Sequence, residues 1–237
     1  MPAIVTPTAY GVTVAVAVGA GALVCTGARR HPGPWRAWVA WILGLLLLAD
    51  AVSFIVALVV AGTFSAKTSL PLALCDMAAL VAAAACWTRV AVLVELTYFW
   101  GLAGTLQAVI TPDLNAGFPH LVFFQYMVGH LGIVVAALYL VVGLRITPRP
   151  GAVLRVFAIT LGYTAFVGLV DGLTGANYMF LRSPPGEWTL LKVLGPWPWY
   201  IGSAAGVALV LLVALDAPFW GSRRRRDAVP SLTASRT

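Results

Sequence analysis

Charged residues are scarce in this chain. Only 10% of its 237 residues are Asp, Glu, Lys or Arg, whereas 61% are hydrophobic, and the mean hydropathy is +0.93. A water-soluble domain could not cover its surface with so few polar side chains. The composition therefore excludes a sizeable soluble domain. It predicts one all-α, polytopic membrane helix bundle at residues 1–221, followed by a basic cytoplasmic tail at residues 222–237 that we expect to be disordered.

Lysine and histidine are almost absent, which argues against two classes of cofactor-bearing membrane protein. The only lysines, Lys67 and Lys192, lie in predicted loops, so none can form a retinal Schiff base in the last helix. Of the three histidines only His130 lies inside a predicted crossing helix, so a haem held by two membrane histidines is not expected. No short spacing of metal ligands occurs. We expect no cofactor and no metal.

Cysteine is rare as well, with three in the chain. Cys25 and Cys86 fall near helix ends that we expect to face the cytoplasm, where thiols stay reduced, and Cys75 falls nearer the other side. This placement predicts no disulfide. The net charge of +7 is dispersed along loops and the tail, which argues against a nucleic-acid partner and favours membrane lipids.

Long apolar runs are abundant. A crossing helix needs about 20 mostly apolar residues, and backbone groups in lipid must be bonded internally, which favours helices. Turn segments such as RRHPGP and RITPRPG separate the runs. The pattern predicts seven crossing helices, one of them short, at residues 8–27, 37–62, 70–87, 90–110, 121–144, 153–174 and 198–219.

The placement of Lys and Arg predicts the orientation. With the N-terminus outside, 12 of the 15 basic residues fall in cytoplasmic segments, and only Lys67, Arg182 and Lys192 fall outside. An even number of crossings would spoil this asymmetry. We therefore expect a multi-pass protein of the cell membrane with its N-terminus outside and its C-terminus in the cytoplasm.

Polar residues from several predicted helices share the outer half of the membrane. His130 lies about nine residues into the fifth helix, and Cys75 about five residues into the third, both counted from outside. Asp76, Gln107 and Asp171 lie at similar depth. Ionisable groups in the membrane are costly and usually mark function, so this convergence predicts a site.

The stretch TSLPLALCDMA predicts how Cys75 is presented. Pro71 suits the first turn of a helix, and Ser69 or Thr68 could cap it, which places Cys75 in the second turn near the positive end of the helix dipole. A thiolate with a histidine base is a standard nucleophilic pair. The residues alone also allow simple packing for Cys75 and a structural hydrogen bond for His130.

Other polar residues have simpler interpretations. Thr160 and Thr164 lie on one stripe of the sixth helix and are typical of helix–helix contacts. Asp171, on the same stripe, needs a partner or water. Asp50, near the middle of the second helix, needs an internal partner, whereas Glu95 can pair with a cytoplasmic arginine.

The segment after the sixth helix is aromatic and long. Trp188, Trp197 and Trp199 are typical of a belt at headgroup depth, and WTLLKVL could lie flat as a short interfacial helix. The same segment could instead form a lid, in which Asn177 and Arg182 meet a lipid phosphate.

Four stretches carry a resemblance to a known family. They are GANYMFLR and LLKVLGPWPWYI after the sixth helix, and YFWGLAGTLQAVITPDL and FPHLVFFQYMVGH in the fourth and fifth. In order and spacing they resemble YwaF-type bacterial integral membrane proteins across residues 70–220. That family is similar to the animal transmembrane protein 164 family, an acyltransferase family acting on ether phospholipids.

The resemblance implies a phospholipid acyltransferase or hydrolase with a thioester mechanism. By motif position, Cys75 and His130 correspond to the cysteine and histidine implicated in acyl transfer. His130 would take the proton of Cys75, and the thiolate would attack a lipid ester in a pocket open to the outer leaflet. The supporting residues would be Asp76, Gln107, Tyr126, Asp171 and Asn177, with Arg182 as a headgroup ligand.

The chain departs from the family pattern at two positions. The pattern reads LPLHLC where this chain reads LPLALC, so Ala73 replaces a histidine, and relatives tend to carry Asn where Asp171 stands. If the histidine at position 73 were the base, the activity would be altered or lost. The alternative is a non-enzymatic lipid-binding protein or transporter with Asp50, Asp171 and His130 as a relay, although no internal repeat is evident.

Overall fold

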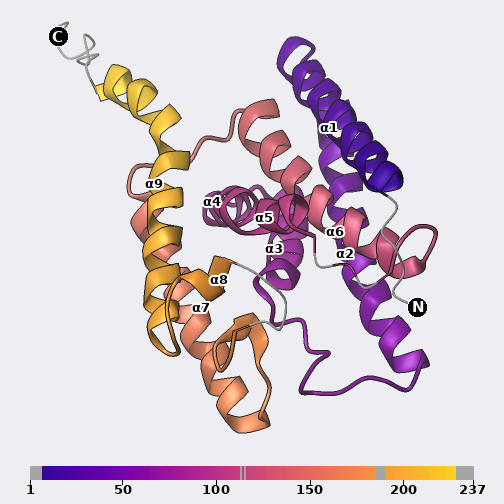
Figure 1. Ribbon diagram of the computed structural model, residues 1–237. Helices are drawn as coiled ribbons and strands as arrows, with labels where there is room; N and C mark the ends of the chain where they lie inside the picture. Colours follow the sequence, from indigo (N-terminus) through magenta and orange to yellow (C-terminus); the bar gives the residue numbers. More distant parts are fainter. Residues whose placement is uncertain (1–6, 113, 115, 185–189, 228–237) are drawn as a thin grey trace, which may run out of the picture.

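The computed structural model describes residues 7–112, 114, 116–184 and 190–227, and these form helices without strands (Figure 1). The elements in chain order are α1 (Pro7–Arg30), α2 (Trp35–Val60), α3 (Leu74–Thr88), α4 (Ala91–Phe99), η1 (Trp100–Thr105), α5 (Leu106–Ile110), α6 (Leu121–Leu138), η2 (Tyr139–Gly143), α7 (Ala152–Thr174), η3 (Tyr178–Phe180), α8 (Leu190–Val193) and α9 (Trp199–Asp227). The prediction of an all-α bundle is confirmed.

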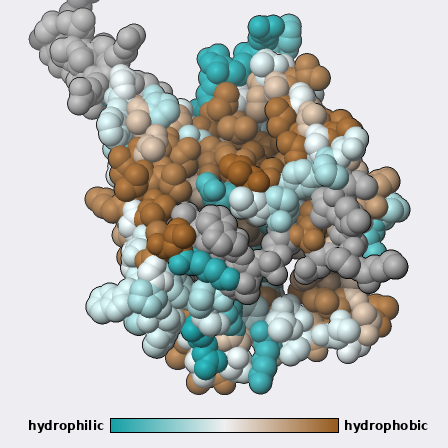
Figure 2. Space-filling view, in the orientation of Figure 1, coloured by the Kyte–Doolittle hydropathy of each residue, from teal (hydrophilic) through white to brown (hydrophobic). Residues whose placement is uncertain are grey.

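Six helices of the described chain are long and apolar enough to cross a membrane. They are Pro7–Arg30, Trp35–Val60, Ala91–Ile110, Leu121–Gly143, Ala152–Thr174 and Trp199–Gly221. The third of these joins α4, η1 and α5, and the fourth joins α6 and η2. Figure 2 shows a broad hydrophobic band on one face with hydrophilic residues gathered at its upper and lower ends. These features indicate a multi-pass membrane protein.

Helix α3 is the short apolar helix at the centre of the bundle. Its 15 residues extend about 22 Å, less than the hydrocarbon thickness of about 30 Å. It packs against α2, α4 and α6 through small, fully buried side chains such as Ala78, Ala82 and Ala85, which allow close approach of helix backbones. Figure 1 shows α7 and α9 on one side of this centre and α1 and α2 on the other.

The start of α3 differs from the prediction. The helix begins at Leu74, after an extended N-cap residue, Ala73, that makes no side-chain cap bond, so the proposed capping by Ser69 or Thr68 is wrong. Ser69 Oγ instead accepts a hydrogen bond from the backbone of Ser65. Two tertiary hydrogen bonds hold the preceding backbone outside the helix, because tyrosine hydroxyls from distant segments bind the amide of Leu70 and the carbonyl of Leu72.

Helix α9 runs to Asp227, six residues into the segment that we expected to be disordered. The cause is a salt bridge between Arg223 Nη1 and Asp216 Oδ2 at 2.7 Å, two turns earlier on the same helix. Arg223 Nη2 also donates to the carbonyl oxygen of Pro148 at 2.8 Å, which ties α9 to the loop before α7. The rest of the tail, residues 228–237, lies outside the described residues.

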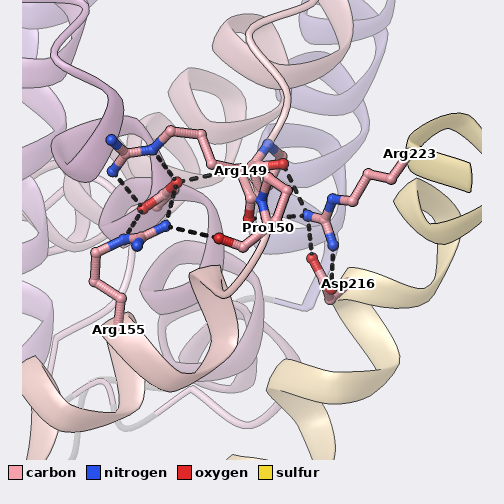
Figure 3. Close-up of polar contacts among 7 residues, drawn as sticks. Arg149, Pro150, Arg155, Asp216 and Arg223 are labelled. Atoms are coloured by element: carbon pink, nitrogen blue, oxygen red, sulfur yellow. Dashed lines mark hydrogen bonds and ion pairs between the residues drawn. The ribbon is translucent and has the colours of Figure 1, made fainter. Parts of the chain in front are cut away.

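A second ionic cluster fixes the same end of the bundle (Figure 3). Glu95, in the middle of α4, is buried and bonds both Arg149 Nε at 2.8 Å and Arg155 Nε at 2.9 Å. The expected pairing of Glu95 with an arginine is thus confirmed. Thr160 also plays the expected contact role, because Trp100 Nε1 donates to its hydroxyl at 2.8 Å.

Candidate functional site

A cavity of about 240 Å³ lies between α2, α3 and α6. Its polar lining consists of Asp50, Cys75, Asp76, Gln125, Tyr126 and His130. Two of these, Cys75 and His130, are the residues for which the sequence predicted the roles of nucleophile and base. The structure therefore brings the two into one cavity from helices whose first residues, Leu74 and Leu121, are 47 positions apart in the sequence. His130 lies nine residues after the start of α6.

Helical spacing explains how each element contributes one face. On α6, Gln125, Gly129 and Ile133 recur every four residues, and His130 lies beside them. On the α3 side, Cys75 and Ala79 are likewise four residues apart. Residues four apart lie on the same face of a helix, one turn above another, so short stretches suffice to line the cavity.

His130 is held in one orientation by its own helix. Its Nδ1 lies 2.8 Å from the carbonyl oxygen of Tyr126, and the two rings stack with centroids 4.1 Å apart. A carbonyl oxygen can only accept, so Nδ1 carries the proton and Nε2 of the neutral ring keeps its lone pair. Tyr126 is itself fixed, because its hydroxyl donates to the carbonyl oxygen of Ala108 at 2.6 Å. The imidazole is thus arranged to act as a base through Nε2.

Cys75 lies in the first turn of α3, not in the second as predicted. This position is closer to the positive end of the helix dipole. The side chain of Thr105, buried at the end of the π-helical segment η1, interacts with the Cys75 thiol. The neighbouring Asp76 carboxylate interacts with the backbone N–H of Ala73.

Four predicted supporting residues lie outside this cavity. Gln107, on α5, is exposed, and the other three lie around the C-terminal end of α7. Asp171 Oδ1 accepts the backbone N–H of Tyr178 at 2.9 Å. Asn177 Oδ1 accepts the backbone N–H of Arg182 at 2.9 Å. These bonds fix the chain that follows α7. The predicted convergence of polar residues from four helices is therefore wrong for this cavity, because α3 and α6 are the two of the four that supply polar residues to it.

Arg182 also contributes to this turn, since its Nη1 lies 3.4 Å from the carbonyl oxygen of Ala176. Trp197 Nε1 donates to the carbonyl oxygen of Leu181 at 3.0 Å, which anchors the aromatic segment against it. Within the stretch predicted to form a short interfacial helix, the structure has a single helical turn, α8, at Leu190–Val193. Its place relative to the membrane interface stays a prediction. Trp188 lies outside the described residues.

Sequence reasoning missed two polar residues of the cavity, Asp50 and Gln125. Asp50 was expected to need an internal partner but was not assigned to the site. Gln125 was overlooked, although a glutamine in the apolar run FFQYMVGH, one turn before Gly129, was a usable signal. Ala73, where the family pattern has a histidine, is not among the lining residues.

Comparison with known proteins gives one match. No curated protein and no solved structure shows significant similarity to this chain. The model of the TMEM164 family matches residues 4–216, which is 213 of the 237 residues. The narrower resemblance to YwaF-type bacterial proteins stays a prediction. Because the match covers nearly the whole chain, including every residue of the cavity, the protein belongs to the TMEM164 family.

Proposed function

We propose that the protein is a lipid acyltransferase or lipid hydrolase that uses Cys75 as nucleophile and His130 as base. The observation that carries the proposal is the shared cavity, to which α3 contributes the thiol and α6 the imidazole. The tautomer supports it, since the proton on Nδ1 leaves Nε2 as the acceptor. No metal or cofactor is needed for this chemistry.

The reaction has two balanced halves. His130 Nε2 takes the proton from Cys75 Sγ, and the thiolate attacks the carbonyl carbon of a lipid ester. The tetrahedral intermediate collapses, the C–O bond breaks, and the imidazolium gives its proton to the departing lysolipid oxygen, which leaves an acyl-cysteine. A lysolipid hydroxyl or water then gives its proton to Nε2 and attacks the thioester carbonyl carbon. The C–S bond breaks, and the imidazolium returns its proton to Sγ, which regenerates the thiol and the neutral imidazole.

Lipid reaches the site sideways, from the bilayer. Phe54 on α2 and Val122 on α6 line the cavity, and both are also exposed on the apolar outer surface, by 41% and 38%. A cavity of about 240 Å³ is at the small end for a ligand site, since drug-sized pockets begin near about 300 Å³. It suits the ester group, while the chains of the lipid remain in the membrane.

The proposed topology has seven crossings in the cell membrane, with α3 as the short one. The N-terminus is outside and the C-terminus is cytoplasmic, in line with the positive charge around Glu95 and on the last turns of α9. In this orientation the start of α3 and the cavity face the outer leaflet. Cysteine labelling from outside tests the topology: a cysteine introduced at Thr63 should react with a membrane-impermeant maleimide on intact cells, and one introduced at Arg145 should not.

Acyl exchange on labelled phospholipid in liposomes tests the chemistry. Cys75→Ser and His130→Gln should each lower turnover by at least about 100-fold, because the first variant loses the thiol nucleophile and the second loses the general base. Cys86→Ser and His120→Gln are matched controls, since neither residue lines the cavity, and both should retain turnover. Unchanged turnover in Cys75→Ser would remove the proposal.

A second candidate is a lipid-binding protein or transporter that relays protons between Asp50 and His130. The observation in its favour is that these two ionisable groups line one cavity. Asp171, which the sequence had placed in the same relay, is instead bonded to the turn after α7. Covalent labelling of Cys75 by an acyl-thioester probe would favour the enzyme, whereas proton-coupled lipid uptake without labelling would favour the transporter.

A further inference from the structure

Asp50 is a carboxylate of the cavity to which the described part of the chain donates no hydrogen bond. Asp76 interacts with the backbone of Ala73, and Asp171 is bonded to Tyr178 outside the cavity. Asp50 lines the cavity but accepts no side-chain hydrogen bond from the residues that the structure describes. A carboxylate within a membrane-spanning helix costs free energy and usually marks a functional site. The Asp50 carboxylate, which faces the cavity, is therefore a candidate for a functional role.

The position of this carboxylate is built by both helices. A Cβ atom on Gly129 would lie 2.9 Å from Asp50 Oδ2. Because residue 129 is a glycine, the carboxylate has space beside α6 at the position that precedes His130. Gln125 Nε2 donates to Ser53 Oγ at 2.9 Å, and Ser53 Oγ donates to the backbone carbonyl of Asp50 at 2.8 Å. These bonds join α2 to α6 one turn from the glycine, and so hold the carboxylate on the α6 side of the cavity.

We infer that Asp50 is a positioning residue that stabilises the imidazolium of His130 when Cys75 is deprotonated. The inference rests on the proposed function. Asp50 acts through its charge, because His130 Nδ1 is already bonded to the carbonyl oxygen of Tyr126. Charges interact strongly where water is largely excluded. The other titratable groups that face the cavity are Asp76 and Tyr126, and no Lys or Arg is among the lining residues.

The rate of Cys75 alkylation by iodoacetamide tests the inference without any lipid substrate. The full chain in liposomes is alkylated at pH 7 and pH 10, and the Cys75 peptide is quantified by mass spectrometry. In Asp50→Asn the rate at pH 7 should fall by about tenfold, because the thiolate–imidazolium pair loses its stabilising charge. At pH 10 the histidine is neutral, so the rate should be unchanged or higher, because the lost negative charge had opposed the thiolate.

Two further variants separate charge from structure. Asp50→Glu keeps the charge and should keep most of the pH 7 rate. Asp171→Asn removes a carboxylate outside the cavity and should leave the ratio of the two rates unchanged. An equal fall at both pH values in Asp50→Asn would reveal a structural role and overturn the inference.

The variant His130→Gln distinguishes the inference from the proposed function beneath it. If His130→Gln slows alkylation at pH 7 and Asp50→Asn does not, the thiol–imidazole pair stands and the role of Asp50 is refuted. If His130→Gln has no effect at pH 7, the pair does not form and the proposed function fails with the inference.

Discussion

Replacing Glu95 should cost the bundle a large part of its stability. The side chain is only 1% exposed, and its two oxygens accept five hydrogen bonds from Arg149 and Arg155 (Figure 3). In Glu95→Gln the amide keeps one accepting oxygen, and its nitrogen faces donors. Two guanidinium groups then lose the negative charge between them.

The expected loss is about 3–5 kcal/mol of unfolding free energy, the range for removing one partner of a buried ionic group. Arg149→Gln should cost less, because Arg155 still balances the charge of Glu95 and the Arg149 side chain is half exposed. Arg145→Gln is the matched control: this exposed arginine lies in the same loop, and its replacement should stay within about 0.5 kcal/mol.

Reversible unfolding in mixed micelles of SDS and a mild detergent, followed by circular dichroism, measures these differences. The expected order of stability is wild type and Arg145→Gln, then Arg149→Gln, then Glu95→Gln. If Glu95→Gln unfolds at the same SDS fraction as Arg145→Gln, the cluster contributes nothing to stability and the reasoning is refuted.

Three further predictions use the same fold. In the micelle assay Gly129→Ala should destabilise the bundle by about 1–3 kcal/mol, because the new Cβ would lie 2.9 Å from Asp50 Oδ2. The control Gly162→Ala has nothing within 4 Å of its Cβ and should leave stability unchanged or raise it by up to about 1 kcal/mol. Equal effects of the two substitutions would contradict this packing. Tyr178→Phe should speed tryptic cleavage after Lys67, because the lost hydroxyl binds the Ala66 carbonyl and the Leu70 amide. The control Tyr10→Phe loses a hydrogen bond to Val109 instead and should leave the cleavage rate unchanged. Equal rates in the two variants would mean that Tyr178 does not hold this loop. Arg223→Gln should speed hydrogen exchange over residues 217–227 by releasing α9 from Asp216 and Pro148; unchanged exchange would mean that other contacts hold this end.

The sequence predicted the helices well because the signal for a crossing helix is local. The lengths of the apolar runs and the turn segments between them are properties of neighbouring residues, and six of the predicted spans correspond to long helices. The start of α3 could not be predicted in the same way. It depends on the hydroxyls of Tyr163 and Tyr178, which are about 90 and 108 residues away in sequence and bind the backbone of Leu72 and Leu70.

The sequence by itself determined that this is a helical membrane protein. It also predicted a thiol and an imidazole at similar depth, by counting residues along each helix at a fixed rise. The direction in which each side chain points around its helix, and which helices are neighbours, follow from packing. Tertiary structure alone therefore decided that Cys75 and His130 share a cavity with Asp50. It also placed Asp171, at a similar predicted depth, in the turn after α7, because two residues at one depth can still face different sides of a bundle.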